Sequence, residues 1–156
     1  MLRHVTWIMI FCLLSLSVYV QKSSFADNVL WTPAGNDIYL NEQTLTHISG
    51  AVHSLWIRIV PDKDSSLYTR STQQLRDMGK DHAALDYVGY LTEIDCKTVR
   101  YREILTMFYR KDKNIIGSLH KEGSPWQEIT GDSMITDVYR TVCSGFLAEN
   151  WYDEPC

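Results

Sequence analysis

The chain has 156 residues, of which 45% are hydrophobic, and it carries 15 basic and 19 acidic side chains. This length is enough for one domain with a core of its own. Removal of the leader described next takes away Arg3 and Lys22 but no acid, so 13 bases face 19 acids and the net charge becomes −6. An acidic domain of this kind is a poor candidate for general nucleic-acid binding.

Residues 1–26 have the pattern of a secretory signal peptide. A basic start at Arg3 precedes the apolar run Val5–Val20, and Ser24 and Ala26 are small residues at the positions that a signal peptidase reads. We expect cleavage before Asp27, a domain over residues 27–143, and a tail over residues 144–156. The alternative is an uncleaved membrane anchor, but the apolar run of 16 residues is shorter than the roughly 20 of a spanning helix.

The first part of the domain has the residue pattern of three strands. Strand-forming residues are separated by turn signals at Gly35-Asn36-Asp37 and at Ser49-Gly50. The strands are expected at Val29–Ala34, Ile38–Leu40 and Ala51–Val60. In the third strand, Leu55, Ile57 and Ile59 alternate with Trp56, Arg58 and Val60. The polar segment Asn41–Leu45 is expected to form a single helical turn.

The segment Pro61–Asp86 interrupts the strand pattern. Leu75, Met78 and Leu85 have partial helical spacing, which predicts one weak helix within a long connection. Long connections of this kind are usually either functional or disordered, and the sequence leaves both readings open.

The segment Tyr87–Arg110 predicts a β-hairpin, because its two arms are rich in residues that favour strands. Strict alternation in the second arm divides its side chains into two sets. One set is Arg100, Arg102, Ile104, Thr106 and Phe108, and the other is Tyr101, Glu103, Leu105, Met107 and Tyr109. A hairpin is not stable alone, so further strands or a helix must cover it.

After the hairpin, Ile115–His120 predicts another strand and Trp126–Ile129 a short extended segment. A helix follows, which Asp132 or Ser133 can cap. Its apolar residues fall at helical spacing and form one stripe, namely Ile135, Val138, Tyr139, Val142 and Cys143. The predicted fold class is therefore α+β, an antiparallel sheet of about six strands with a C-terminal helix packed on one face.

The expected mature chain has three cysteines, and export places them in an oxidising compartment. Cys96 at the end of the first hairpin arm has an obvious partner in Cys143 on the helix, and the alternative is two separate thiols. We expect a structural disulfide, because no Cys-x-x-Cys spacing indicates a redox enzyme. Cys156 is then either a free thiol or an intermolecular bridge, and the protein is expected to be a monomer or a weak or Cys156-linked dimer.

No motif for a metal, a cofactor or catalysis stands out. The four mature histidines, His47, His53, His82 and His120, lack the short paired spacing of zinc ligands. The sequence contains no Gly-x-Ser-x-Gly, and the acids Asp81, Asp86, Glu93 and Asp95 are spaced as ordinary exposed residues are. We expect neither an enzyme nor a cofactor.

The hairpin carries an excess of bases in an otherwise acidic protein. With neighbouring tyrosines they can form a patch for an acidic partner, such as a protein surface or a glycan. The alternative is a solvated sheet face whose charges protect an edge from pairing. The candidate binding residues are Lys97, Arg100, Tyr101, Arg102, Arg110, Lys111 and Lys113.

The order of several motifs resembles the surface-adhesin protein E-like family of exported Gram-negative bacterial domains. The motifs run from Val29-Leu30-Trp31 and Asp37-Ile38-Tyr39-Leu40 through Leu55-Trp56-Ile57-Arg58, Glu93-Ile94-Asp95-Cys96-Lys97, Arg100-Tyr101-Arg102, Tyr109 and Trp126-Gln127-Glu128-Ile129 to Cys143. The resemblance implies an antiparallel sheet with a disulfide-tethered C-terminal helix and a role in binding host extracellular-matrix proteins. The tail after Cys143 and the details of Pro61–Asp86 depart from the family pattern.

We therefore expect an exported protein of the periplasm or outer cell surface of a Gram-negative bacterium that binds a protein or glycan without catalysis. The alternative is a periplasmic inhibitor or assembly accessory protein that meets no host molecule. No membrane span and no nucleic-acid partner are expected after signal cleavage.

Overall fold

The computed structural model describes residues 30–121, 123–131 and 133–143. The predicted signal peptide, Asp132, Cys156 and the rest of the tail lie outside these residues. The strands are β1 (Trp31–Gly35), β2 (Ile38–Ser49), β3 (Val52–Ile59), β4 (Tyr87–Asp95), β5 (Arg100–Tyr109), β6 (Ile115–His120) and β7 (Gln127–Glu128). The helices are α2 (Ser66–Asp77), the short 3-10 helix η2 (His82–Ala84) and α3 (Met134–Cys143).

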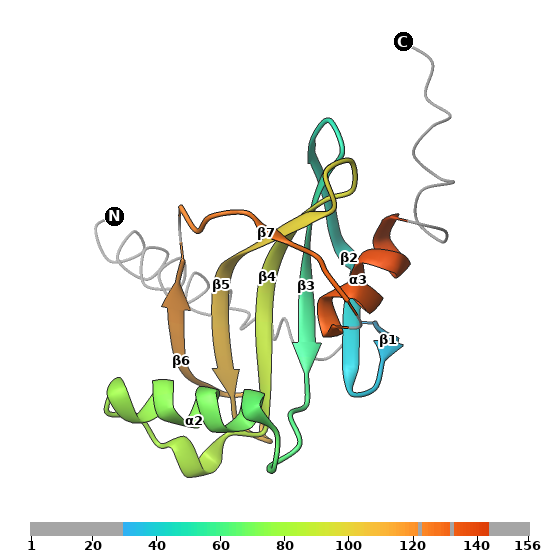
Figure 1. Cartoon of the computed structure of the whole chain (residues 1–156). Helices are drawn as coiled ribbons and strands as arrows, with labels where there is room; N and C mark the ends of the chain where they lie inside the picture. The colour runs from blue at the N-terminus through green and yellow to red at the C-terminus, as the bar shows by residue number, and fades with distance from the viewer. Residues whose placement is uncertain (1–29, 122, 132, 144–156) are drawn as a thin grey trace, which may run out of the picture.

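The strands form one antiparallel sheet in which chain neighbours are also sheet neighbours, in the order β1-β2-β3-β4-β5-β6, while β7 pairs with β5 (Figure 1). Both α-helices lie over the same face of this sheet, α3 near β1 to β3 and α2 across the other end (Figure 1). We call the helix-covered face, which carries Leu40, Ile57 and Val88, the inner face, and the opposite one the outer face. The predicted α+β class and the sheet with a C-terminal helix are confirmed.

The inner face holds two apolar clusters, because every second side chain of a strand points the same way. Val138 and Val142 of α3 pack on residues of β2 to β4, among them Leu40 and Ile57, which are 1% and 3% exposed. Leu75 of α2 packs on Val88, Phe108 and Ile116. Each helix therefore covers its own part of the same sheet face.

The predicted helical turn at Asn41–Leu45 is wrong, because β2 continues through it with a bulge. The pairing with β3 jumps from Asn41↔Trp56 to Thr46↔Ser54. At the bulge, a side chain replaces the backbone partners that regular pairing would supply. The Thr44 hydroxyl accepts a hydrogen bond from the Trp56 amide at 3.0 Å and donates one to the Asn41 carbonyl at 2.8 Å. The polar residues that suggested a turn serve this irregularity.

The β4–β5 hairpin is confirmed, but the strict alternation predicted for its second arm is wrong. The register passes from Leu91↔Leu105 to Thr92↔Glu103, so Ile104 is an extra residue in β5. A one-residue shift exchanges the two faces of a strand. Glu103 and Tyr101 therefore lie on the inner face with Thr106 and Phe108, opposite Thr92 and Ile94 respectively.

The long connection Pro61–Asp86 contains a regular helix, α2, which begins earlier than the partial spacing suggested. Ser65 caps it, since its hydroxyl accepts from the Tyr68 amide at 3.1 Å. Leu75 is fully buried, whereas Met78 follows the helix as its C-cap and His82 belongs to η2. Leu75 is the fully buried contact of the helix with the sheet, and Leu67 and Tyr68 of the same helix also pack on the two apolar clusters.

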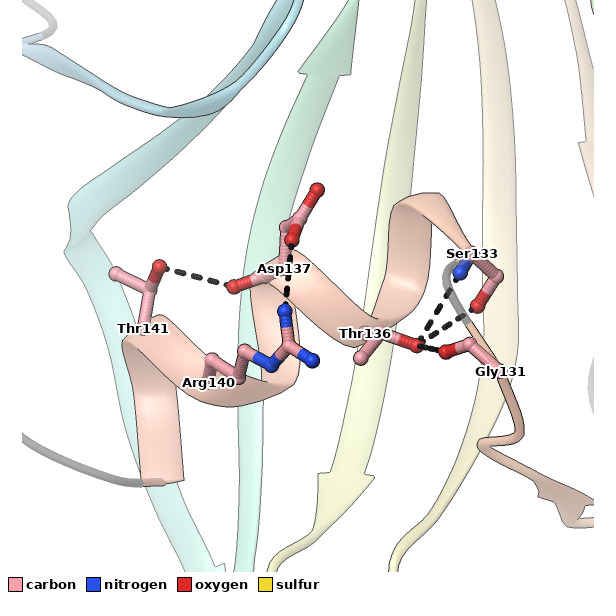
Figure 2. Close-up of polar contacts among 6 residues, drawn as sticks. All are labelled: Gly131, Ser133, Thr136, Asp137, Arg140 and Thr141. Atoms are coloured by element: carbon pink, nitrogen blue, oxygen red, sulfur yellow. Dashed lines mark hydrogen bonds and ion pairs between the residues drawn. The ribbon is translucent and has the colours of Figure 1, made fainter.

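The helix α3 follows the apolar stripe that the sequence predicted, and a disulfide joins its end to the sheet. The Thr136 hydroxyl donates to the Gly131 carbonyl at 2.7 Å and lies 3.0 Å from the Ser133 hydroxyl at the start of the helix (Figure 2). The Ser133 hydroxyl thus contacts the Thr136 side chain, while the Ser133 carbonyl accepts from the Thr136 amide at 2.8 Å. Cys96 and Cys143 form the expected disulfide, with their Cα atoms 5.5 Å apart.

Candidate functional site

The outer face of the sheet carries partly exposed aromatic side chains and one central arginine. The strand register places them on the face opposite the core, and no helix in the described part of the chain covers them. They are Trp31 of β1, Tyr39 of β2, Trp56 and Arg58 of β3, Tyr87 of β4 and Tyr109 of β5. We call these six residues the aromatic surface.

Arg58 lies among three of these rings. Its guanidinium carbon is 4.5 Å from the ring centroid of Tyr39, 5.0 Å from Trp31 and 5.7 Å from Tyr87. Such contacts stabilise a cation by about 0.5–2 kcal/mol, depending on its exposure. Arg58 makes no ion pair with a described residue, and its Nε is buried without a hydrogen-bond partner among them. Aromatic rings therefore hold a cation that has no carboxylate partner there.

Tyr87 and Tyr109 extend this surface as a stacked pair. Their rings are nearly parallel, with centroids 4.6 Å apart and an interplanar angle of 10°. Burial raises the pKa of both phenols, and the neighbouring tyrosine adds to the rise at Tyr87. Both phenols therefore stay protonated near neutral pH and add hydrogen-bonding groups to the surface.

The predicted basic residues do not form one patch, because they occupy two ends of the hairpin. The ten residues of β5 separate the ends by about 30 Å. Lys97 and Arg100 lie at the β4–β5 turn, where Arg100 is 3.6 Å from Glu128. Arg110, Lys111 and Lys113 lie at the turn before β6, where Arg110 is 3.4 Å from Asp81. Their role in binding stays a prediction.

Two residues of the predicted set follow Arg100 near the start of β5 and lie on opposite faces of the sheet. Arg102 is on the outer face, where it pairs with Glu93 at 2.6 Å and lies 4.7 Å from the ring of Trp126. Tyr101 is on the inner face opposite Ile94. The outer face thus has a second arginine beside an aromatic ring, but Arg102, unlike Arg58, forms an ion pair with a carboxylate.

His47 and His53 face each other across the β2–β3 hairpin, with ring centroids 5.5 Å apart. Burial and the neighbouring His47 lower the pKa of His53. Within the described residues, no group of three or more histidine, cysteine, aspartate or glutamate side chains is arranged to hold a metal ion.

Sequence reasoning missed Arg58 and its rings, although the alternation at Leu55–Val60 already placed Trp56 and Arg58 on one face. The missing information was strand pairing. Trp31, Tyr39 and Tyr87 come from three other strands, and only the register brings them together. Of the described helices, none is long and apolar enough to cross a membrane.

No protein-family model and no curated protein matches this sequence. Among solved structures, the selenomethionine form of Haemophilus influenzae protein E has a TM-score of 0.46 and 11% identity, over 77% of this chain and 97% of that one. Protein E from non-typeable Haemophilus influenzae has a TM-score of 0.46 and 9% identity, over 72% of this chain and 74% of that one. Similarity at this level carries no conclusion about function.

Proposed function

We propose that this chain is an exported, non-catalytic binding protein that holds a protein partner on the aromatic surface of its sheet. The observation that carries the proposal is Arg58, a cation held by three aromatic rings with no acid partner among the described residues. The signal-like sequence of residues 1–26 supports export to the periplasm or cell surface.

The composition of the surface favours a protein as the partner. Trp, Tyr and Arg are the residues most often found at the energetic centres of protein interfaces. The surface combines two tryptophans, three tyrosines and one arginine on neighbouring strands. A partner segment with an Asp or Glu among apolar side chains would place its carboxylate on Arg58 and its apolar groups on the rings.

The charge of Arg58 is expected to contribute specificity rather than only attraction. An apolar partner without an acid would bury the guanidinium and leave it unpaired, which costs free energy. An acidic segment avoids that cost and gains a charge-assisted hydrogen bond. The proposed partner class is therefore an acidic, partly apolar protein surface.

The test compares the exported protein with Arg58→Met and the matched control Arg76→Met. Methionine keeps an unbranched side chain over the rings but removes the charge, while Arg76 lies on α2, where its guanidinium donates to the Gln73 side chain of the same helix at 2.9 Å. Proteins captured from envelope and host-matrix extracts are measured against all three by calorimetry at low and high salt.

We expect a partner whose affinity falls at least about tenfold with Arg58→Met, weakens with salt, and is unchanged with Arg76→Met. If every captured protein binds Arg58→Met as tightly as the wild type, the proposal is wrong. Sedimentation velocity adds a second check: an Arg58-dependent homodimer would mean that the surface pairs copies of this chain instead.

A further inference from the structure

The inner face holds a cavity of about 300 Å³ between the two helices, which we call the inter-helix cleft. Its floor is the C-terminal end of β3 with parts of β4 and β5, and its walls are α2, α3 and four residues between β6 and α3, namely Lys121, Glu128, Thr130 and Ser133. In Figure 1, α2 and α3 lie over different parts of the same sheet face, with the central strands between them. The volume is at the lower end of the roughly 300–1,000 Å³ typical of small-molecule sites.

The floor of the cleft contains a buried hydroxyl without a partner. Thr106 is 2% exposed, and its Oγ1 makes no hydrogen bond to any described residue. Neighbouring Thr92 is 1% exposed and also lines the cleft. Buried hydroxyls in proteins nearly always have a hydrogen-bond partner, since leaving one unpaired costs free energy. A ligand hydroxyl in the cleft would supply that partner, because it can both donate and accept.

Two tyrosines add further hydrogen-bonding groups to the cleft. Tyr101 donates its hydroxyl to the Gln127 side chain at 3.0 Å, which leaves its oxygen able to accept. Tyr90 of β4 also lines the cleft, and burial raises its pKa, with Glu103 adding to the rise. Burial and then Glu103 raise the pKa of Tyr101 as well, so both phenols stay neutral near pH 7. The polar part of the cleft is thus rich in hydroxyl groups, which suit a ligand that carries several hydroxyls itself.

Among the described residues that line the cleft, all charged side chains but one form an ion pair. Glu103 forms an ion pair with Lys121, and Glu128 lies 3.6 Å from Arg100. Arg70 of α2 lines the cleft but makes no ion pair with a described residue. As far as the described residues go, a ligand in the cleft would therefore meet one positive charge without an acid partner, so a single negative charge on the ligand is favoured.

Most of the remaining lining is apolar, and its polar members are Gln74, Thr130 and Ser133. The apolar side chains are Ile57 and Ile59 of β3, Leu67 of α2, and Met134, Ile135 and Val138 of α3. This combination of apolar side chains, several hydroxyl groups and one cation without an acid partner among the described residues differs from a plain apolar cavity. A sugar ring has the matching features, since its axial C–H groups form an apolar face and its hydroxyls point outward.

We propose that the inter-helix cleft binds a saccharide unit that carries a carboxylate, such as a uronic or sialic acid. Ring hydroxyls would bond to Thr106 and Tyr90, the carboxylate would lie near Arg70, and the C–H face of the ring would rest on the isoleucines. This site is on the sheet face opposite the aromatic surface, so it is independent of the function proposed above.

The test is a titration of the full exported protein, followed through its backbone amide NMR signals. Glucuronic acid and N-acetylneuraminic acid are the probes, and glucose is the neutral comparison. We expect an acid to shift the signals of cleft residues such as Thr92, Tyr101 and Thr106, with glucose at least about tenfold weaker. If neither acid shifts these signals, or if the shifts map to the outer face, the proposal is wrong.

Variants then test the roles of Thr106 and Arg70 in sugar binding. Thr106→Val removes the hydroxyl with little change of shape and should weaken binding at least about tenfold, while Thr106→Ser should retain it. Arg70→Met should abolish the preference for the acid over glucose, and Arg76→Met on the same helix should behave as the wild type. Binding by Thr106→Val and Arg70→Met at wild-type strength would overturn the assignment.

A fold control separates lost binding from lost structure. Because the Thr106 hydroxyl has no described partner, Thr106→Val should unfold at a denaturant concentration no lower than the wild type. If Thr106→Val unfolds at a lower denaturant concentration, the test of the site relies on Thr106→Ser and Arg70→Met instead. Weak sugar binding by Thr106→Ser would reject the site. An unchanged preference of Arg70→Met for the acid over glucose would also reject it. Arg58→Met should leave sugar binding unchanged, so the two proposals fail separately.

Discussion

The disulfide between Cys96 and Cys143 should be the largest single contribution to the stability of this domain. It closes a loop with a sequence separation of 47 residues. In the chain-entropy model, a crosslink of this span stabilises the folded state by about 4 kcal/mol. For a chain of this size, each kcal/mol corresponds to about 2–4 °C, so loss of the crosslink should lower Tm by about 8–16 °C.

The assay compares Cys96→Ser/Cys143→Ser with Cys156→Ser, both under non-reducing conditions. The double variant should show the full loss, while Cys156→Ser keeps the crosslink and should unfold like the wild type. Because the crosslink ends at the last residue of α3, which forms one wall of the inter-helix cleft, the double variant should also bind acidic sugars more weakly. A double variant with the wild-type Tm would refute the reasoning, since α3 would then be held by its apolar stripe alone.

Two further predictions concern the β2–β3 hairpin and the outer face. Burial and His47 lower the pKa of His53 below 6.5, so the unfolded chain takes up its proton first and stability should fall as the pH drops below about 6.5 and level off below the folded pKa. Urea unfolding over this range should show a smaller loss in His53→Gln, and an equal loss would contradict the assignment. In Gly89→Ala, the new Cβ would lie 3.1 Å from the Tyr109 ring and 3.6 Å from Trp56, so we expect a loss of about 1–3 kcal/mol and a weaker near-UV circular dichroism signal. Unchanged stability would mean that the tyrosine pair can move without cost.

The parts of the fold that follow local patterns were predictable from the sequence. The alternation at Leu55, Ile57 and Ile59 correctly identified a strand with one buried face, and all three are at most 4% exposed. The stripe on α3 correctly identified its buried side through Val138 and Val142. These patterns are reliable because each depends on one element and one face.

The parts that depend on register were not predictable in the same way. Asn41–Leu45 looks like a helical turn because its polar side chains bond to nearby backbone, and the sequence does not say whether they do so in a turn or in a bulge. The aromatic surface gathers rings from four other strands around Arg58, and the inter-helix cleft gathers described residues from four strands and two helices. Single-element patterns contain no information about such pairings.

The extra residue Ile104 decides which chemistry each side of β5 offers. Without it, the pleat would carry Tyr101 and Glu103 to the aromatic side and bring Arg100 and Arg102 beneath the helices, where two guanidinium groups would have to be desolvated. Glu93 would lose its partner and Lys121 would lose Glu103. The inserted residue thus places the arginines of β5 on the outer face and Tyr101 and Glu103 in the inter-helix cleft. A homologue without this insertion would need other residues to supply both sets of groups.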